Sequence, residues 1–353
     1  MAHFLKLDLV MLFTIFFVFG TGFAVILSIV FLFGLPITWA LAIFLIIVLL
    51  QWYMAPKIVK GSLNLRYLKE GEIPWLEKMV EELAKKAEVP KPKIAIFHDP
   101  DPNAFVFGRT RGSSTLTLHT GLVECFSRKE IRAVIAHELG HIKRYDCSII
   151  TIASIGPIIL YNLSIAFLDS AEESLGGSTS HLIFAVIFYV LALTSYTGYF
   201  LTNLLVLWLS RSREYYADAF SAFLTKKPHD LEKALARISY GLAIGEESKN
   251  KLRIFCIEDQ LLARKEIYEI LEKKDVYDLD RNGILDRHEI ELAMKREYDL
   301  NRDGRLDGHE LQLAMKKQVR GIFNRLNEII STHPPTYRRI EQLDKIGRET
   351  KEI

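Results

Sequence analysis

The segment EIRAVIAHELGHIKRYD, residues 130–146, decides the fold that we expect for this chain. It contains an H-E-x-x-H pattern in which His137 and His141 are four positions apart. On a helix these two side chains lie on one face, so both imidazoles can bind one zinc ion. Glu138 lies on the neighbouring edge, within reach of a water on that metal, and is the candidate catalytic base. The pattern therefore predicts a zinc-dependent hydrolytic site on a helix.

A catalytic zinc site needs a third protein ligand and one open coordination position. The segment REYYAD, residues 213–218, supplies Glu214 as the candidate third ligand. Asp218 follows four positions later and can hydrogen-bond a ligand imidazole, as carboxylates commonly do around bound zinc. A solvated acidic helix face is the alternative, but carboxylates next to a membrane span usually serve a function. We therefore predict that His137, His141 and Glu214 bind one zinc ion.

Four apolar stretches are long enough to cross a membrane, which takes about 20 residues. They lie at residues 8–33, 36–54, 147–168 and 182–209 and form two predicted hairpins. The first stretch is too long for the apolar core of a signal peptide, and no convincing cleavage site follows it. The lipid bilayer is therefore a predicted partner.

The basic residues indicate how these spans are oriented, because cytoplasmic loops carry an excess of Lys and Arg. The connector at 169–181 has neither residue type, whereas Lys57, Lys60, Arg211 and Arg213 lie near the opposite ends of the spans. We therefore expect a plasma-membrane protein with a cytoplasmic catalytic domain. The formal net charge of +2 gives no reason to expect a nucleic-acid partner. The three widely spaced cysteines are typical of free thiols in a reducing compartment.

The segments between the spans alternate between helical and strand patterns. Residues 62–90 and 128–146 have helical periodicity, and Ser127 with Glu130 predicts a capping box at the start of the second helix. Three short runs rich in β-branched and aromatic residues, at 93–98, 103–109 and 114–119, predict strands.

The predicted fold class is mainly α with a small β-sheet, in a multi-spanning membrane protein with about four transmembrane helices and a cytoplasmic zincin-type metallopeptidase domain. The predicted parts follow one another along the chain: an N-terminal transmembrane hairpin (1–54), the first part of the peptidase domain (55–146), a second transmembrane hairpin (147–209), the second part of the peptidase domain (210–257), a tandem insertion (258–320) and the C-terminal part of the peptidase domain (321–353).

The chain resembles the HtpX-type membrane metallopeptidases, relatives of the CAAX prenyl proteases. The resemblance is carried by PNAF (102–105), the segment 130–146, REYYAD (213–218) and STHPP (331–335). It implies a gluzincin fold, with zinc bound by His137, His141 and Glu214, and a role in clearing damaged or unassembled membrane proteins.

The same resemblance implies roles for four further residues. Asn103 and Ala104 match the edge strand that faces the substrate. His333 matches a histidine near the scissile carbonyl, and Arg339 matches the basic position after it. STHPP could equally be no more than a helix start with proline in its first turn.

Two twelve-residue acidic loops, DLDRNGILDRHE (278–289) and DLNRDGRLDGHE (299–310), match the EF-hand calcium loop. Their predicted ligands are Asp278, Asp280, Asn282, Ile284, Asp286 and Glu289 in the first loop, and Asp299, Asn301, Asp303, Arg305, Asp307 and Glu310 in the second, with Ile284 and Arg305 using backbone carbonyls. We expect two Ca²⁺ ions there, although acidic turns without metal are the alternative. This segment departs from the HtpX-type pattern and is predicted to be an insertion.

The predicted function is a membrane-bound zinc metalloendopeptidase in protein quality control and stress response. Its predicted substrates are polypeptides, in particular damaged or unassembled membrane proteins cleaved at the cytoplasmic face, and calcium is a possible modulator. Two alternatives stay open. One is a CAAX-type prenyl-protein processing protease, and the other is a calcium-responsive membrane scaffold with an inactive protease site.

Overall fold

The computed structural model describes residues 36–175, 179–244 and 331–351, together with scattered positions before residue 36 and positions 279 and 292. The chain divides into two compact units. One unit contains residues 1–57 and 148–210, and the other contains residues 58–147 and 211–353. The two predicted calcium loops lie outside the described residues, apart from position 279.

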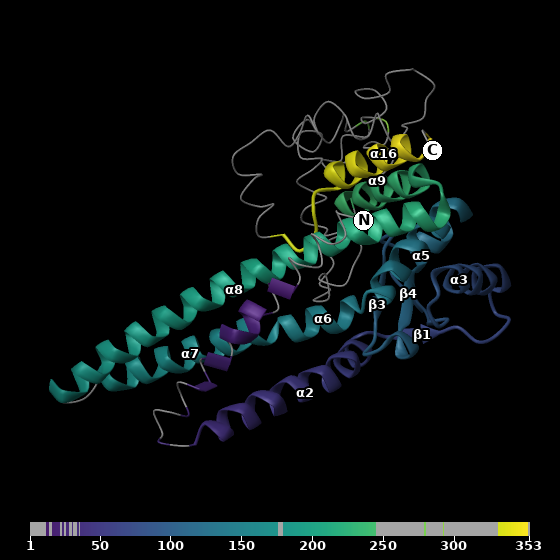
Figure 1. The fold of residues 1–353 in the computed structure, drawn as a ribbon. Coiled ribbons are helices and arrows are strands. Elements are labelled where there is room, and N and C mark those ends of the chain that lie inside the picture. Colours follow the sequence, from purple (N-terminus) through teal and green to yellow (C-terminus); the bar gives the residue numbers. More distant parts are fainter. Residues whose placement is uncertain are drawn as a thin grey trace. The chain divides into compact units, whose positions relative to one another are not determined.

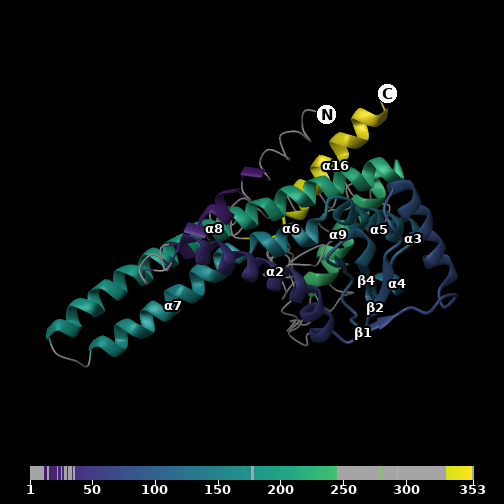
Figure 2. The same cartoon turned by 60° about the horizontal axis from the view of Figure 1, so that its bottom comes forward.

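The first unit is built from long apolar helices: α2 (Ile37–Ser62), α6 (Asp146–Ala153), α7 (Ile155–Leu175) and α8 (Thr179–Thr225), of which α2, α6 and α8 continue into the second unit. Within this unit α7 and α8 lie side by side as an antiparallel hairpin (Figure 1 and Figure 2). Their rings pair across the hairpin, as between Tyr161 and Tyr199 at 5.4 Å.

Three stretches of these helices are long and apolar enough to cross a membrane, namely Ile37–Ser62, Asp146–Leu175 and His181–Thr225. They coincide with the second, third and fourth predicted spans. The first predicted span, 8–33, is described only at scattered positions, and there Val18, Ile26 and Val30 are buried within this unit. The described residues therefore contain the second, third and fourth predicted spans, and the first span, 8–33, stays a prediction.

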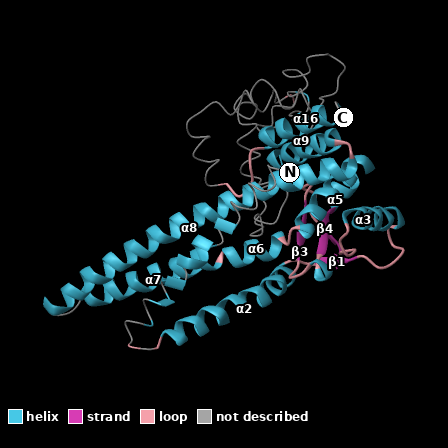
Figure 3. Cartoon of the chain, viewed as in Figure 1, coloured by secondary structure: helices cyan, strands magenta, loops and turns pink. Residues whose placement is uncertain are grey.

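The second unit contains a four-stranded sheet (Figure 3). Its strands are β1 (Leu65–Tyr67), β2 (Lys93–Phe97), β3 (Ala104–Phe107) and β4 (Thr115–His119), in the order β1-β2-β4-β3. The central pair β2 and β4 is parallel, and both outer pairs are antiparallel. Three of these strands confirm the predicted ones, and β3 lies at an edge of the sheet, where its outer backbone groups have no partner strand in the sheet.

One predicted helix, 62–90, is wrong over its first half. That half contains the short strand β1, which pairs with β2 through Leu65 opposite Phe97, and then a turn, and the helix α3 begins only at Pro74 (Pro74–Ala87). Proline lacks an amide hydrogen and suits the first turn of a helix, so α3 starts where the sequence places proline. The pairing of β1 with β2 fixes an extended conformation in the residues before α3. This long-range contact cannot be seen in the helical periodicity of the sequence.

The core of the second unit surrounds α5 (Arg128–Lys143), which packs on β3, α3 and α9 (Pro228–Ile244). The predicted capping box is present: the Ser127 side chain accepts from the Glu130 amide, and the Glu130 carboxylate accepts from the Ser127 amide. The helix α16 (Thr336–Lys351) lies along α9 (Figure 1). Two short elements, a 3-10 turn at Arg111–Ser113 and α4 at Thr120–Cys125, complete the described part of this unit.

Glycine is required where α5 meets α8. A Cβ atom added to Gly140 would lie 3.2 Å from the Cα of Ala217 and 3.2 Å from a ring carbon of Phe220. The absence of a side chain at position 140 lets the two helices approach this closely without a displacement of α8 by a few tenths of an ångström. This contact brings the acidic residues on either side of Ala217 towards the histidines of α5.

Candidate metal centre

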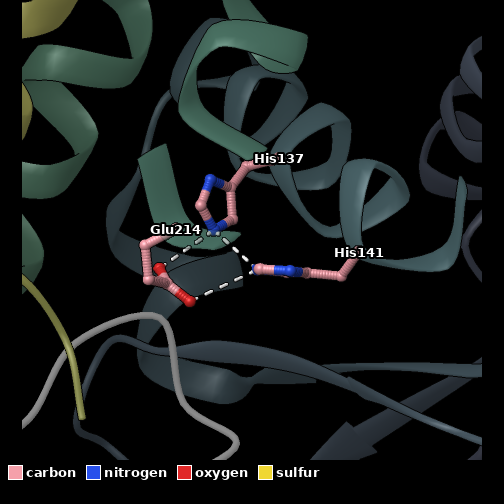
Figure 4. A group of neighbouring side chains, drawn as sticks. All are labelled: His137, His141 and Glu214. Carbon is pink, nitrogen blue, oxygen red and sulfur yellow. Dashed lines mark hydrogen bonds and ion pairs between the residues drawn. The ribbon is translucent and has the colours of Figure 1, made fainter. Parts of the chain in front are cut away.

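Three side chains from two helices converge in the core of the second unit (Figure 4). His137 and His141 extend from α5, and Glu214 extends from α8. The Nε2 atoms of the two histidines are 3.1 Å apart. One Glu214 carboxylate oxygen lies 3.6 Å from Nε2 of His137, and the other lies 3.5 Å from Nε2 of His141. The structure therefore brings together the three residues that the sequence predicts as zinc ligands.

The spacing of these atoms fits a zinc ion. Zinc binds nitrogen and oxygen ligands tetrahedrally at about 2.0–2.2 Å, which puts neighbouring ligand atoms roughly 3.3 Å apart. The observed separations of 3.1–3.6 Å lie around that value. The Oε2 atom of Glu214 is buried and lies 3.3–3.6 Å from Arg339, His333 and His137, but none of these contacts has hydrogen-bond geometry. A cation between the three ligand atoms would give this oxygen a closer partner.

A buried carboxylate lies behind the first imidazole. The Nδ1 atom of His137 is 2.9 Å from Oδ1 of Asp218, which lies one helical turn after Glu214 on α8. Arg339 of α16 binds the same carboxylate with two hydrogen bonds of 2.8 Å and lies 3.3 Å from Glu214. A carboxylate on Nδ1 keeps the proton on that nitrogen and leaves Nε2 free to bind metal. The predicted partnership of Asp218 with a ligand imidazole matches this geometry.

A second carboxylate lies behind the other imidazole, and sequence reasoning missed it. The Nδ1 atom of His141 is 2.6 Å from Oδ2 of Asp146, and the other oxygen of Asp146 contacts Arg213. Asp146 comes five positions after His141, a spacing that a continuous helix places off the face of the histidines. The only signal in the sequence was an aspartate at the end of the helical pattern.

Burial and neighbouring charges shift the pKa values of the two histidines in opposite directions. Burial alone lowers the pKa of both imidazoles, because it disfavours the charged form. For His137, the nearby carboxylates of Asp218 and Glu214 outweigh burial and raise its pKa to about 9. For His141 burial dominates, and its pKa is lowered to about 4. In the metal-free site at neutral pH, His137 is therefore charged and His141 is neutral.

Glu138 is buried between the two histidines on α5. Burial raises the pKa of its carboxyl, while the neighbouring imidazoles act in the opposite direction when they are protonated. A raised pKa brings a carboxylate closer to neutral pH, where a general base works best.

Of the remaining predicted residues, His333 and Arg339 lie near the candidate ligand Glu214, and Asn103 and Ala104 lie in the sheet. His333 lies with its Nδ1 atom 3.5 Å from Glu214, and so, with Arg339, it approaches the third ligand. Asn103 and Ala104 lie at the start of the edge strand β3, which packs on α5. There the carbonyl of Asn103 accepts from the His119 amide, and its side chain accepts from the Ala104 amide.

Two histidines and a glutamate on packed helices, with a second glutamate between the histidines, define a metallopeptidase, here in a chain with membrane-length helices. The chain belongs to peptidase family M48, whose profile matches residues 70–347. A Protease HtpX homolog of Methanothermobacter thermautotrophicus is 35% identical over 237 residues, which are 66% of this chain and 86% of that protein. A Protease HtpX homolog of Pyrococcus abyssi is 37% identical over 213 residues, 58% of this chain and 69% of that protein. Among solved structures, the crystal structure of S. mikatae Ste24p is 23% identical with a TM-score of 0.44, over 67% of this chain and 60% of that one.

Proposed function

We propose that this membrane metalloprotease is a zinc-dependent endopeptidase that cleaves damaged or unassembled membrane proteins at the cytoplasmic face. The observation that carries the proposal is the convergence of His137, His141 and Glu214 around one point, with the buried Glu138 between the histidines. The similarity to proteins named Protease HtpX homolog supports a protease, and the membrane-length helices of this chain favour substrates that are reached at a membrane.

The side chains around the site divide the chemistry between them. A bound zinc ion would polarise the peptide carbonyl and lower the pKa of a water from 15.7 to about 7. Glu138 accepts a proton from the attacking water as the water oxygen bonds to the carbonyl carbon, and then returns that proton to the amide nitrogen, which leaves as the amine when the C–N bond breaks. His333 is the candidate donor to the developing oxyanion, because it lies 3.5 Å from the third ligand.

The edge strand β3 is the candidate binding site for the substrate backbone. It pairs with β4 on one side only, so an extended peptide can pair with its outer side once it displaces the contacts of the Ala104 amide with the Asn103 side chain and of the Val106 carbonyl with Cys147. Asn103 and Ala104 would then lie beside the substrate. Main-chain pairing requires no particular side chains, which suits a protease that acts on many unfolded segments.

The experiment that tests the proposal compares wild type with Glu138→Gln on a destabilised membrane-protein substrate in vesicles, with zinc content measured on both. The amide keeps the size of the side chain but cannot accept a proton, so we expect equal zinc and at least about 100-fold slower cleavage. Equal cleavage rates would contradict the role of Glu138. Zinc binding without cleavage by wild type would favour an inactive scaffold, and cleavage restricted to prenylated peptides would favour CAAX-type processing.

Orientation in the membrane needs its own test, because the proposal places the catalytic unit in the cytoplasm. Leu175→Cys and Pro90→Cys, in a background with the three natural cysteines replaced, put single thiols at two exposed positions. We expect an impermeant reagent to label position 175 in intact cells and position 90 only after lysis. The reverse pattern would contradict the cytoplasmic placement.

Calcium is the second metal in the proposal. The sequence pattern of the two acidic loops supports binding of two ions, with Glu289 and Glu310 as bidentate ligands. Calorimetry on wild type, Glu289→Gln and Glu310→Gln tests binding, and cleavage rates with and without calcium test modulation. No binding heat at millimolar calcium would leave the loops as acidic turns without metal.

A further inference from the structure

The chain makes an unusual turn directly after the helix that carries the two histidines. α5 ends at Lys143, and Tyr145 has a φ of 58°, in the left-handed region. Glycine adopts this conformation readily, whereas a large side chain adopts it at a cost. Residues held in such conformations cluster at functional sites, where surrounding contacts maintain them. The left-handed conformation of Tyr145 therefore indicates that the turn itself has a function.

The residue that the turn positions is Asp146. In a continuous helix, its side chain would lie off the face of His141. The reversal at Tyr145 instead brings one oxygen of Asp146 to 2.6 Å from Nδ1 of His141. The other oxygen contacts Arg213, the residue before Glu214, and the Asp146 side chain is buried.

Contacts from the β3–β4 hairpin hold the turn in place. The guanidinium of Arg111 lies 4.2 Å from the centre of the Tyr145 ring and donates a hydrogen bond to the carbonyl of Lys143. On the other side of Asp146, the thiol of Cys147 donates to the carbonyl of Val106 in β3 at 3.2 Å. The turn is thus fixed immediately before and immediately after Asp146.

We propose that Asp146 is a positioning residue for the metal centre: the left-handed turn at Tyr145, held by Arg111, presents its carboxylate to Nδ1 of His141 and so directs Nε2 of that histidine to the metal. The inference rests on the proposed zinc site. It gives the second imidazole the same kind of support that Asp218 gives the first. Carboxylates in this position typically change metal affinity by about 10- to 100-fold.

The first test measures zinc affinity of the purified full-length protein by competition with a chromogenic chelator. We expect Asp146→Asn to weaken binding about tenfold, because the amide oxygen can still accept from Nδ1 without a charge, and Asp146→Ala to weaken it up to about 100-fold. Asp344→Asn is the matched control, because that aspartate pairs only with the exposed Arg348 among its described ion pairs. Its affinity should equal that of wild type.

A spectroscopic measurement separates positioning from a general loss of structure. With cobalt(II) in place of zinc, the visible absorption of the loaded protein reports the arrangement of its ligands. We expect the Asp146→Asn spectrum to differ from that of wild type at saturating cobalt. A purely structural role would lower the unfolding temperature but leave the spectrum of the loaded protein unchanged.

The turn is tested at Tyr145. Glycine accepts the left-handed conformation, so Tyr145→Gly should keep zinc affinity within about threefold of wild type, whereas Tyr145→Val, with a β-branched side chain, should lose about tenfold. Lys226→Val is the matched control, because Lys226 has a φ of 56° after α8 and no described contact with the metal ligands. It should lose stability but not zinc affinity.

These outcomes are distinguishable from failure of the proposed function. Absence of zinc binding by wild type would overturn the zinc site and this inference together. Normal binding by wild type, with unchanged affinity and cobalt spectrum in Asp146→Ala, would overturn this inference alone. Equal zinc affinities for Tyr145→Val and wild type would mean that the turn at Tyr145 is not needed to position Asp146.

Discussion

Arg339 and Asp218 are joined by two hydrogen bonds of 2.8 Å, and both side chains are fully buried. Asp218 in turn lies 2.9 Å from Nδ1 of His137. The C-terminal helix α16 therefore reaches the metal centre through one guanidinium, although it is separated from α8 by more than a hundred positions in the sequence. Breaking such a buried pair leaves an uncompensated charge, which costs more than the pair itself contributes.

The first prediction concerns this pair. Arg339→Met removes the guanidinium but keeps most of the volume, so the buried Asp218 loses two hydrogen bonds and retains only His137 among its described partners, and we expect a loss of about 3 kcal/mol in the free energy of unfolding. Chemical denaturation of the metal-free protein measures it. Arg339→Met with Asp218→Asn removes both charges and should recover part of the loss. Independent, additive effects of the two substitutions would contradict the pairing.

The second prediction ranks the groups around zinc. Glu214→Ala removes a ligand atom, so we expect little zinc to remain after dialysis against a chelator. Asp218→Asn keeps all three candidate ligands but weakens the support of His137 and the pair with Arg339, so above pH 9, where His137 is neutral in either protein, its affinity should fall by about 10- to 100-fold. Zinc content by atomic emission distinguishes the two variants. A Glu214→Ala protein with a full complement of zinc would mean that another residue is the third ligand.

The third prediction concerns the close approach of α5 and α8. In Gly140→Ala, the new methyl group would lie 3.2 Å from the Cα of Ala217, so α8 must move by a few tenths of an ångström. Overpacking of this kind costs about 1–3 kcal/mol, which exceeds the gain of about 1 kcal/mol from the higher helix propensity of alanine. We expect a lower unfolding temperature and weaker zinc binding, because Glu214 and Asp218 move with α8.

The control for that prediction is Gly61→Ala in α2, where an added Cβ atom meets nothing within 4 Å. This substitution should leave stability unchanged or slightly raised. Should Gly140→Ala bind zinc as tightly as wild type, the close helix contact would not matter for the site.

Local patterns in the sequence predict the parts of the site that lie on one regular element. His137, Glu138 and His141 share one helix, and Glu214 with Asp218 shares another, so helical spacing is enough to group them. Asp146 was missed because its position depends on the left-handed turn at Tyr145, for which a tyrosine gives no signal. Backbone reversals at bulky residues are decided by tertiary contacts, here with Arg111.

The limits of the fold prediction have two origins. Arg211 and Arg213 mark the end of the fourth apolar stretch, but α8 continues through both to Thr225, because charged side chains end a membrane span without ending a helix. The strand β1 was predicted as helix because its partner β2 lies far along the chain, with Leu65 opposite Phe97. Pairing of this kind overrides local propensity.

The last prediction concerns protons. The pKa of His137 is about 9 in the metal-free site, so at pH 7 this imidazole carries a proton that zinc must displace, whereas His141, with a pKa of about 4, carries none to lose. The two histidines should therefore release about one proton when zinc binds at pH 7, in addition to any released by a bound water. Apparent affinity should rise up to about tenfold per pH unit and level off near pH 9, because above that pH His137 is already neutral.

Calorimetric titrations at pH 7 in two buffers with different ionisation enthalpies count the protons. Asp218→Asn removes the charge that raises the pKa of His137, so it should release fewer protons than wild type at the same pH. Equal release from both proteins would mean that Asp218 does not hold the proton on His137.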